Sequence, residues 1–261
     1  MCIRDRSKAD LGIIFDTDVD RAGAVLSDGT ELNRNRIIAM MAAILLREHP
    51  GTTIVTDSIT STGLAAFIRK HGGVHHRFKR GYRNVINESM RLNREGHDSQ
   101  LAMETSGHGA LKENYFLDDG AYLVTRLLIE LARAKKEGYT LESLITDLAE
   151  PAESKEFRMN ILVPDFKAYG QKIIDELNIY AASQPGWSVA PDNFEGVRVN
   201  LDKAHGDGWF LLRLSLHDPL IPLNIESDSV GGVRQIAAEL APFLRPFDQL
   251  DTSALLAFAG C

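Results

Sequence analysis

The feature that most constrains this chain is an apolar run that ends abruptly in acidic residues, LGIIFDTDVDRAGAV at positions 11–25. The run predicts a buried β-strand, and three aspartates follow it at alternate positions, Asp16, Asp18 and Asp20, with Arg21 directly after them. Three carboxylates this close repel one another unless a cation neutralises them. Oxygen ligands of this type suit Mg²⁺, which commonly completes its coordination with phosphate or water. The stretch therefore predicts a magnesium site and phosphate chemistry.

Other interpretations of the acidic triplet can be compared on the residues. An EF-hand calcium loop needs glycine at its sixth position and glutamate at its twelfth, where this chain has Arg21 and Ser27, so that interpretation fails. A haloacid-dehalogenase-like phosphatase also places Asp-x-Asp after an apolar strand, with the first aspartate, here Asp16, as nucleophile. It normally has threonine or valine four residues later, where this chain has Asp20. A solvated acidic turn without a ligand is the third alternative.

The composition is typical of a soluble globular protein with more than one domain. The chain has 261 residues, of which 44% are hydrophobic and 25% charged. Its net charge of -7 argues against a general nucleic-acid binder. The only cysteines, Cys2 and Cys261, support neither a disulfide framework nor a cysteine metal site. Without a membrane-length apolar run or a signal-peptide pattern, we expect a cytoplasmic protein that does not bind membranes.

Hydrophobic periodicity after residue 32 predicts an α/β fold with a mainly parallel sheet and flanking helices. The expected helices span 33–48, 61–71, 81–95 and 120–136, and the expected strands span 53–56, 74–78 and 101–103. Strands that alternate with helices at this spacing form right-handed βαβ units. Ligands bind such sheets at the carboxyl ends of the strands.

Two of these strand ends carry polar clusters. The first is basic and opens a helix, where cations add to the preference for anions, although a solvated basic patch is an equal alternative. It consists of Lys79, Arg80, Gly81, Tyr82 and Arg83. The second cluster, Glu104-Thr105-Ser106-Gly107-His108-Gly109, combines a carboxylate, two hydroxyls and an imidazole on a flexible loop. Such groups can hydrogen-bond a polyol, so we expect this loop to bind a sugar.

The pattern changes near residue 150 and predicts a smaller α+β domain. Its expected strands span 157–163, 196–201, 208–215 and 220–226, and its expected helices span 165–177 and 230–244. Arg213 and Ser215, between two strands, form a candidate phosphate clamp. We expect three parts: 1–32, the end of a truncated α/β domain with the metal loop; 33–150, an α/β sugar-recognition domain; and 151–261, an α+β phosphate-binding domain.

Taken together, these segments resemble the α-D-phosphohexomutase family of phosphoglucomutases and phosphomannomutases. Its members have a phosphoserine domain, a magnesium loop Asp-Gly-Asp-Gly-Asp-Arg, a sugar loop Glu-x-Ser-Gly-His and a phosphate loop Arg-x-Ser-Gly/Asn-Thr. The resemblance implies that Asp16, Asp18 and Asp20 bind Mg²⁺. It also implies catalytic roles for Arg21, beside the phosphoserine, and for His108, in proton transfer. The implied ligands of the hexose phosphate are Lys79, Arg80, Gly81, Tyr82, Glu104, Ser106, His108, Arg213, Ser215 and His217.

The chain also departs from the family pattern. Thr17 and Val19 replace the two glycines of the metal loop, and Leu216-His217-Asp218 replaces the end of the phosphate loop. No segment resembles the family's phosphoserine loop. The resemblance implies phosphoryl transfer between C1 and C6 of a hexose phosphate through a hexose 1,6-bisphosphate, and we expect this chain alone to be inactive. The alternatives are the dehalogenase-like sugar phosphatase and a non-catalytic sugar-phosphate-binding module. The preferred sugar and the oligomeric state are not predicted.

Overall fold

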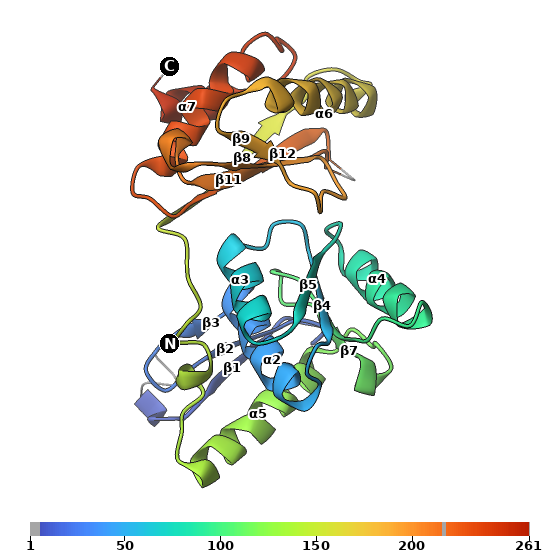
Figure 1. The fold of residues 1–261 in the computed structure, drawn as a ribbon, viewed down its shortest axis with the longest axis vertical. Coiled ribbons are helices and arrows are strands. Elements are labelled where there is room, and N and C mark those ends of the chain that lie inside the picture. The colour runs from blue at the N-terminus through green and yellow to red at the C-terminus, as the bar shows by residue number, and fades with distance from the viewer. Residues whose placement is uncertain (1–5, 216–217, 261) are drawn as a thin grey trace. The chain divides into compact units, whose positions relative to one another are not determined.

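The protein, described here by a computed structural model, forms two compact units, Met1–Ala149 and Glu150–Cys261 (Figure 1). The structure describes residues 6–215 and 218–260. Both units combine β-sheets with flanking helices, which confirms the predicted α/β class with an α+β second part. None of the helices in the described ranges is both long and apolar enough to cross a membrane.

The central sheet of the first unit contains the three predicted parallel strands. Strand β4 (Thr53–Thr56) lies between β5 (Val74–Arg77) and β6 (Ser99–Met103) and runs parallel to both. A fourth strand, β7 (Gly109–Leu111), pairs antiparallel with β6 and gives the order β5-β4-β6-β7. Because β4 to β6 are parallel, their carboxyl ends meet at one edge of the sheet.

Helices cover both faces of this sheet. Apolar side chains of the same strand pack against helices on either side, because successive strand residues point to opposite faces. The first unit's helices are α2 (Arg34–Glu48), α3 (Thr62–Lys70), α4 (Tyr82–Arg94) and α5 (Gly120–Glu137). Ile54 and Leu101 belong to a core with α2, α3 and α5, whereas Val55 and Ala102 pack with Val85 of α4. Helix α2 is buried continuously from residue 37 to residue 46. The predicted helix boundaries differ from these by one residue or less.

The acidic stretch lies in a separate three-stranded antiparallel sheet of the first unit. Its strands are β1 (Gly12–Phe15), β2 (Ala22–Val25) and β3 (Glu31–Leu32). The prediction that β1 is buried is wrong: Ile14 is 58% exposed and Phe15 is 40% exposed. Strand β1 is an edge strand of its sheet and pairs only with β2. An apolar sequence favours burial but does not determine whether another helix or strand covers it.

The second unit contains a five-stranded antiparallel sheet. Its order is β8 (Glu153–Asn160), β12 (Leu220–Ser227), β11 (Gly208–Leu212), β10 (Val197–Leu201) and β9 (Trp187–Val189). The helices are α6 (Phe166–Ser183), α7 (Gly232–Leu244) and α8 (Ser253–Ala259). One face of the sheet, with Val199, Phe210 and Leu223, packs against these helices. The sequence does not predict β9 or α8, which are short.

Candidate functional site

The three aspartates of the metal loop converge between β1 and β2. Asp16, Asp18 and Asp20 each offer a carboxylate oxygen, and these oxygens lie within 4.8 Å of one another. The loop turns at Val19, which has a φ of 64° and donates its backbone N–H to the Asp16 carbonyl at 3.3 Å. A β-branched residue rarely adopts this left-handed conformation, so the turn that gathers the carboxylates is strained.

Arg21 holds the first of these carboxylates. Its Nε donates to Oδ2 of Asp16 at 2.5 Å, its backbone N donates to Oδ1 of the same residue at 3.2 Å, and its Nε lies 3.7 Å from Oδ1 of Asp20. Partial burial opposes ionisation of Asp16, but the hydrogen bonds from Arg21 outweigh it and lower the pKa of Asp16. Asp16 is therefore ionised at neutral pH and available as a cation ligand.

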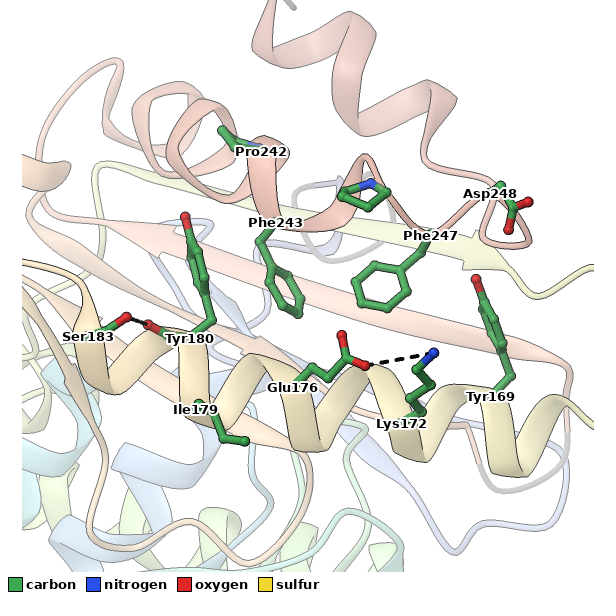
Figure 2. A pocket seen from close by; sticks show the side chains of 11 residues that line it. Tyr169, Lys172, Glu176, Ile179, Tyr180, Ser183, Pro242, Phe243, Phe247 and Asp248 are labelled. Carbon is green, nitrogen blue, oxygen red and sulfur yellow. Dashed lines mark hydrogen bonds and ion pairs between the residues drawn. The ribbon is translucent and has the colours of Figure 1, made fainter.

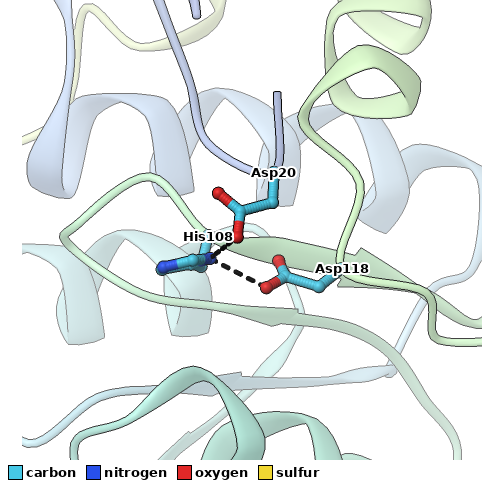
Figure 3. Close-up of side chains that lie close together, drawn as sticks. All are labelled: Asp20, His108 and Asp118. Atoms are coloured by element: carbon cyan, nitrogen blue, oxygen red, sulfur yellow. Dashed lines mark hydrogen bonds and ion pairs between the residues drawn. The ribbon is translucent and has the colours of Figure 1, made fainter. Parts of the chain in front are cut away.

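His108 belongs to residues 104–108 after β6, called the sugar loop after its predicted role, and it lies beside Asp20, the last aspartate of the metal loop (Figure 3). Its Nδ1 lies 2.8 Å from Oδ2 of Asp118 and 3.7 Å from Oδ2 of Asp20, and Figure 3 shows the other ring nitrogen pointing away from both carboxylates. The Tyr82 ring stacks on the imidazole at a centroid distance of 4.9 Å. The His108 ring is thus held by Asp118 at Nδ1 and by the Tyr82 ring on one face, and Nε2 points away from the two carboxylates.

Asp118 owes its position to the start of helix α5. Asp119 caps this helix by accepting the N–H of Tyr122 at 2.9 Å, and Asp118 immediately before it accepts the N–H of Gly109 at 3.2 Å. Burial raises the pKa of Asp118 and the charge of Asp20 raises it further, whereas His108 lowers it. His108 therefore partly offsets the repulsion between the carboxylates of Asp118 and Asp20.

Backbone contacts fix the separation of the two loops. Arg21 and His108 form an antiparallel bridge, and the N–H of Ala22 donates to the carbonyl of Gly107 at 3.3 Å. Helix α5 also packs directly on the metal loop, because a Cβ on Gly120 would lie 2.8 Å from the Arg21 carbonyl carbon. Only glycine fits there. The arrangement of metal loop, sugar loop and α5 is thus set by the main chain.

Two groups of side chains could hold a metal ion. One is the aspartate triplet of the metal loop, whose all-oxygen donors suit Mg²⁺. The other is Asp20, His108 and Asp118, whose mixed donors are more typical of transition metals. Asp20 belongs to both groups. The first group fits magnesium better, because His108 in the second already has a hydrogen-bond partner in Asp118.

Glu104 connects the sugar loop to the basic cluster. Its side chain is buried, and Oε1 accepts the N–H of Gly81 at 2.6 Å while Oε2 accepts the hydroxyl of Ser106 at 3.2 Å. Lys79 is exposed and Arg80 half-buried at the start of this segment. The structure thus brings residues 79–82 beside residues 104–108, at the shared edge of the parallel sheet.

A cavity of about 280 Å³ lies beside the metal loop. Asp16, Arg21, Ser106 and Gly107 line it, together with Arg34 at the start of α2. The sequence analysis did not identify Arg34, although a cation at a helix N-terminus was the signal used for Lys79. Two guanidinium groups and a hydroxyl suit an anionic, hydroxylated ligand of modest size.

The second unit carries the remaining predicted residues. Backbone bonds from the N–H of Arg213 to the Pro222 carbonyl at 3.2 Å, and from Ser215 to Leu220 at 3.0 Å, continue the β11–β12 ladder past the strand ends. Alternation along this ladder places the Arg213 and Ser215 side chains on one face, while Leu214 packs against the core. His217 lies outside the described residues.

A larger cavity, of about 760 Å³, lies in the second unit between α6 and the end of α7 (Figure 2). Aromatic rings line most of it: Tyr169, Tyr180, Phe243 and Phe247. None of the predicted site residues lines this cavity. Size alone therefore does not identify the functional site, and the charged side chains converge at the smaller cavity of the first unit.

Sequence reasoning missed two acidic residues near the site. Asp118 had a signal, the Asp-Asp-Gly that precedes a helix, but its pairing with His108 depends on the turn between β6 and β7. Asp57 directly follows β4 and is fully buried, with its carboxylate bound to Thr105 of the sugar loop. The rule that ligands bind at the ends of parallel strands points to its position, but a single aspartate there forms no motif.

Comparison with known proteins gives consistent results. Residues 33–151 match the family model described as phosphoglucomutase/phosphomannomutase, alpha/beta/alpha domain III. The chain is 32% identical over 231 residues to phosphomannomutase/phosphoglucomutase from Pseudomonas putida, covering 87% of this chain and 45% of that protein. A phosphoglucomutase/phosphomannomutase family protein from Burkholderia thailandensis superposes with a TM-score of 0.76 at 28% identity, covering 96% of this chain and 50% of that one.

More distant structures share the fold. The N-acetylphosphoglucosamine mutase of Aspergillus fumigatus, solved in complex with GlcNAc-6P and magnesium, superposes with a TM-score of 0.59 at 13% identity, covering 90% of this chain and 48% of that one. The chain spans about half the length of the relatives that it matches.

Proposed function

This chain belongs to the α-D-phosphohexomutase family, and we propose that it binds a hexose phosphate and orients it for phosphoryl transfer between C1 and C6. The observation that carries the proposal is the backbone bridge between Arg21 and His108, which joins the metal loop to the sugar loop. A phosphate neutralised at the first loop would lie close to sugar hydroxyls held by the second. Phosphoryl transfer depends mainly on such positioning and on charge neutralisation.

The residues present fit a magnesium ion. Asp16, Asp18 and Asp20 would hold it, and when bound it would neutralise negative charge on phosphoryl oxygens. Arg21 would contribute a second positive charge beside the phosphoryl group. His108 would hold or deliver a proton at Nε2, because Nδ1 is engaged by Asp118.

Each unit contains candidate substrate-binding residues. In the first unit, Glu104 and Ser106 would accept and donate hydrogen bonds to sugar hydroxyls, while Lys79 to Tyr82 would help to select which end of the sugar phosphate faces the phosphoserine. In the second unit, Arg213 and Ser215 would bind the phosphate that does not react. His217 is a further candidate there. Hexose phosphate and hexose 1,6-bisphosphate are the proposed ligands, and glucose, mannose and amino-sugar derivatives are equal candidates.

The serine that carries the phosphoryl group is proposed to lie outside these 261 residues, since no segment of the sequence resembles the family's phosphoserine loop. The chain would then be part of an intramolecular phosphotransferase and would not isomerise a hexose phosphate alone. A coupled assay with glucose 1-phosphate and Mg²⁺ tests this. Conversion by the 261-residue chain would contradict the proposal, and release of inorganic phosphate that is lost in Asp16→Asn would favour the phosphatase alternative.

Binding tests the proposal directly. Titration of the ¹⁵N-labelled chain with glucose 1-phosphate in the presence of Mg²⁺ should shift the amide signals of residues 104–108. Glu104→Gln should weaken the affinity about tenfold, the usual effect of losing a charge-assisted hydrogen bond. Glu153 is a matched control, because its carboxylate accepts the N–H of Gly231 at 2.8 Å in the second unit as that of Glu104 accepts Gly81. Glu153→Gln should bind like the wild type, and equal losses in both variants would contradict a specific role of Glu104.

A further inference from the structure

We propose that Asp57 is a positioning residue for the sugar loop, Glu104 to His108, and that its carboxylate sets the affinity of this loop for a hexose phosphate. The inference deepens the proposed function and rests on it. Asp57 belongs to neither candidate metal group and does not line the cavity beside the metal loop. Its role would be to hold residues that touch the ligand.

The geometry of Asp57 is that of a clamp on the middle of the sugar loop. Oδ2 accepts the hydroxyl of Thr105 at 2.7 Å, and Oδ1 accepts the backbone N–H of the same residue at 3.4 Å. Thr105 lies between Glu104 and Ser106, so both neighbours take their direction from a residue that Asp57 fixes. The Asp57 carbonyl is itself held by the hydroxyl of Thr60 at 3.0 Å.

The clamp is one link in a series that joins three strand ends. Asp57 follows β4 and binds the loop after β6, and Glu104 of that loop binds Gly81 after β5. Each bond joins loops that are far apart in sequence and adjacent at one edge of the sheet. Displacement of Thr105 would therefore move Glu104 and, through it, the segment that begins at Gly81.

Burying the carboxylate of Asp57 costs folding free energy, and a purely structural contact could be made by an uncharged side chain. Its side chain is fully buried beside the buried carboxylate of Glu104, while Arg80 supplies an opposing positive charge. Burial, and then the charge of Glu104, raise the pKa of Asp57 to about 6, and the bonds from Thr105 moderate the increase. Two buried like charges oppose folding, and such groups concentrate at functional sites.

The experiment compares Asp57→Asn with a matched control elsewhere in the first unit. Asp28 accepts the backbone N–H and the hydroxyl of Thr30 at 2.8 and 2.9 Å, the same pair of bonds, in the turn between β2 and β3. Both variants, ¹⁵N-labelled, are titrated with glucose 1-phosphate and Mg²⁺. We expect Asp57→Asn to weaken the affinity about tenfold and to shift the ligand-free amide signals of residues 104–108, with no drop in melting temperature at about pH 8. Asp28→Asn should change neither the affinity nor those signals.

Thr105→Val gives an independent variant that keeps the shape of the side chain and removes the hydroxyl. It should weaken affinity to a similar extent, and the double variant with Asp57→Asn should be no weaker than either single variant, because all three variants disrupt the same contact. Affinity of the wild-type value in Asp57→Asn, or additive losses in the double variant, would overturn the inference while leaving the proposed function in place. A wild-type chain that shows no shifts with glucose 1-phosphate would overturn both.

Discussion

Nδ1 of His108 lies between two carboxylates, 2.8 Å from Oδ2 of Asp118 and 3.7 Å from Oδ2 of Asp20. The closer partner accepts a hydrogen bond and so selects the tautomer with the proton on Nδ1, which leaves Nε2 as the acceptor. The geometry therefore decides which ring nitrogen can exchange a proton with a ligand.

We predict that Asp118→Ala changes the tautomer of His108. In the wild type the neutral ring should carry its proton on Nδ1, whereas the variant should shift toward the Nε2–H form. Two-bond ¹H–¹⁵N spectra of the imidazole at about pH 8, above the ordinary histidine pKa, distinguish the two forms. His205 provides a control, because its Nδ1 lies 2.7 Å from Asp202 and should keep its signals. Unchanged His108 signals would show that Asp118 does not orient the ring.

The metal loop should bind a divalent cation through all three aspartates. We expect Asp18→Asn to reduce Mg²⁺ affinity by about tenfold or more, because it removes one charged oxygen ligand from a set of three. Titration calorimetry measures this, and Mn²⁺ broadening of nearby amide signals locates the ion. Asp28→Asn, in the turn after β2, should bind Mg²⁺ like the wild type. Equal affinity in Asp18→Asn and the wild type would place the ion at another group.

Asp57 should make the stability of the first unit depend on pH. Its folded pKa of about 6 exceeds the ordinary value of 3.8, so the folded state holds the proton more tightly. The resulting stabilisation is complete below the ordinary pKa and is lost as the pH rises through about 6, an effect on the order of 3 kcal/mol. Asp57→Asn cannot ionise, so its stability relative to the wild type should increase with pH over this range. Hydrogen exchange at Ile54 and Val55 of β4 measures the stability of the first unit. A stability difference between Asp57→Asn and the wild type that does not change with pH would contradict the raised pKa of Asp57.

Val19 should be less stable than glycine at the same position. Its φ of 64° strains a β-branched residue, while the residue is 39% exposed and so gains only part of the stabilisation of full burial. We expect Val19→Gly to stabilise the first unit by about 1 kcal/mol. Val74, 53% exposed in β5, is the control, because there glycine should destabilise by about the same amount. Destabilisation in both variants would show that the Val19 turn is not strained.

Periodicity predicted the parts of the fold that local patterns determine. Strand 53–56 was predicted with its observed boundaries, because a short β-branched run between helices has few other solutions in a βαβ unit. Strand β1 was predicted to be buried for the same apolar pattern, and this was wrong. Apolarity gives a strand a preference for burial but does not specify what covers it. The short elements β9 and α8 carry too few residues for a periodic signal.

The candidate site was predictable only up to the strand ends. The sequence placed Glu104 and Gly81 after two strands of the same sheet, but did not predict the hydrogen bond between them, which depends on the course of two loops. The pairing of His108 with Asp118 likewise requires a hairpin that spans ten residues. Asp57 escaped notice because a single aspartate after a strand has no motif, although its burial distinguishes it at once in three dimensions.

The bridge between Arg21 and His108 and the hydrogen bond from Ala22 to Gly107 are made by peptide groups alone. Side chains on either loop can therefore be exchanged while the distance between them is preserved. The side chains of Thr17 and Val19 take no part in these two backbone contacts. New side-chain chemistry can be introduced on this fixed spacing, whereas insertions or deletions between residues 16 and 22 should be far less tolerated than substitutions.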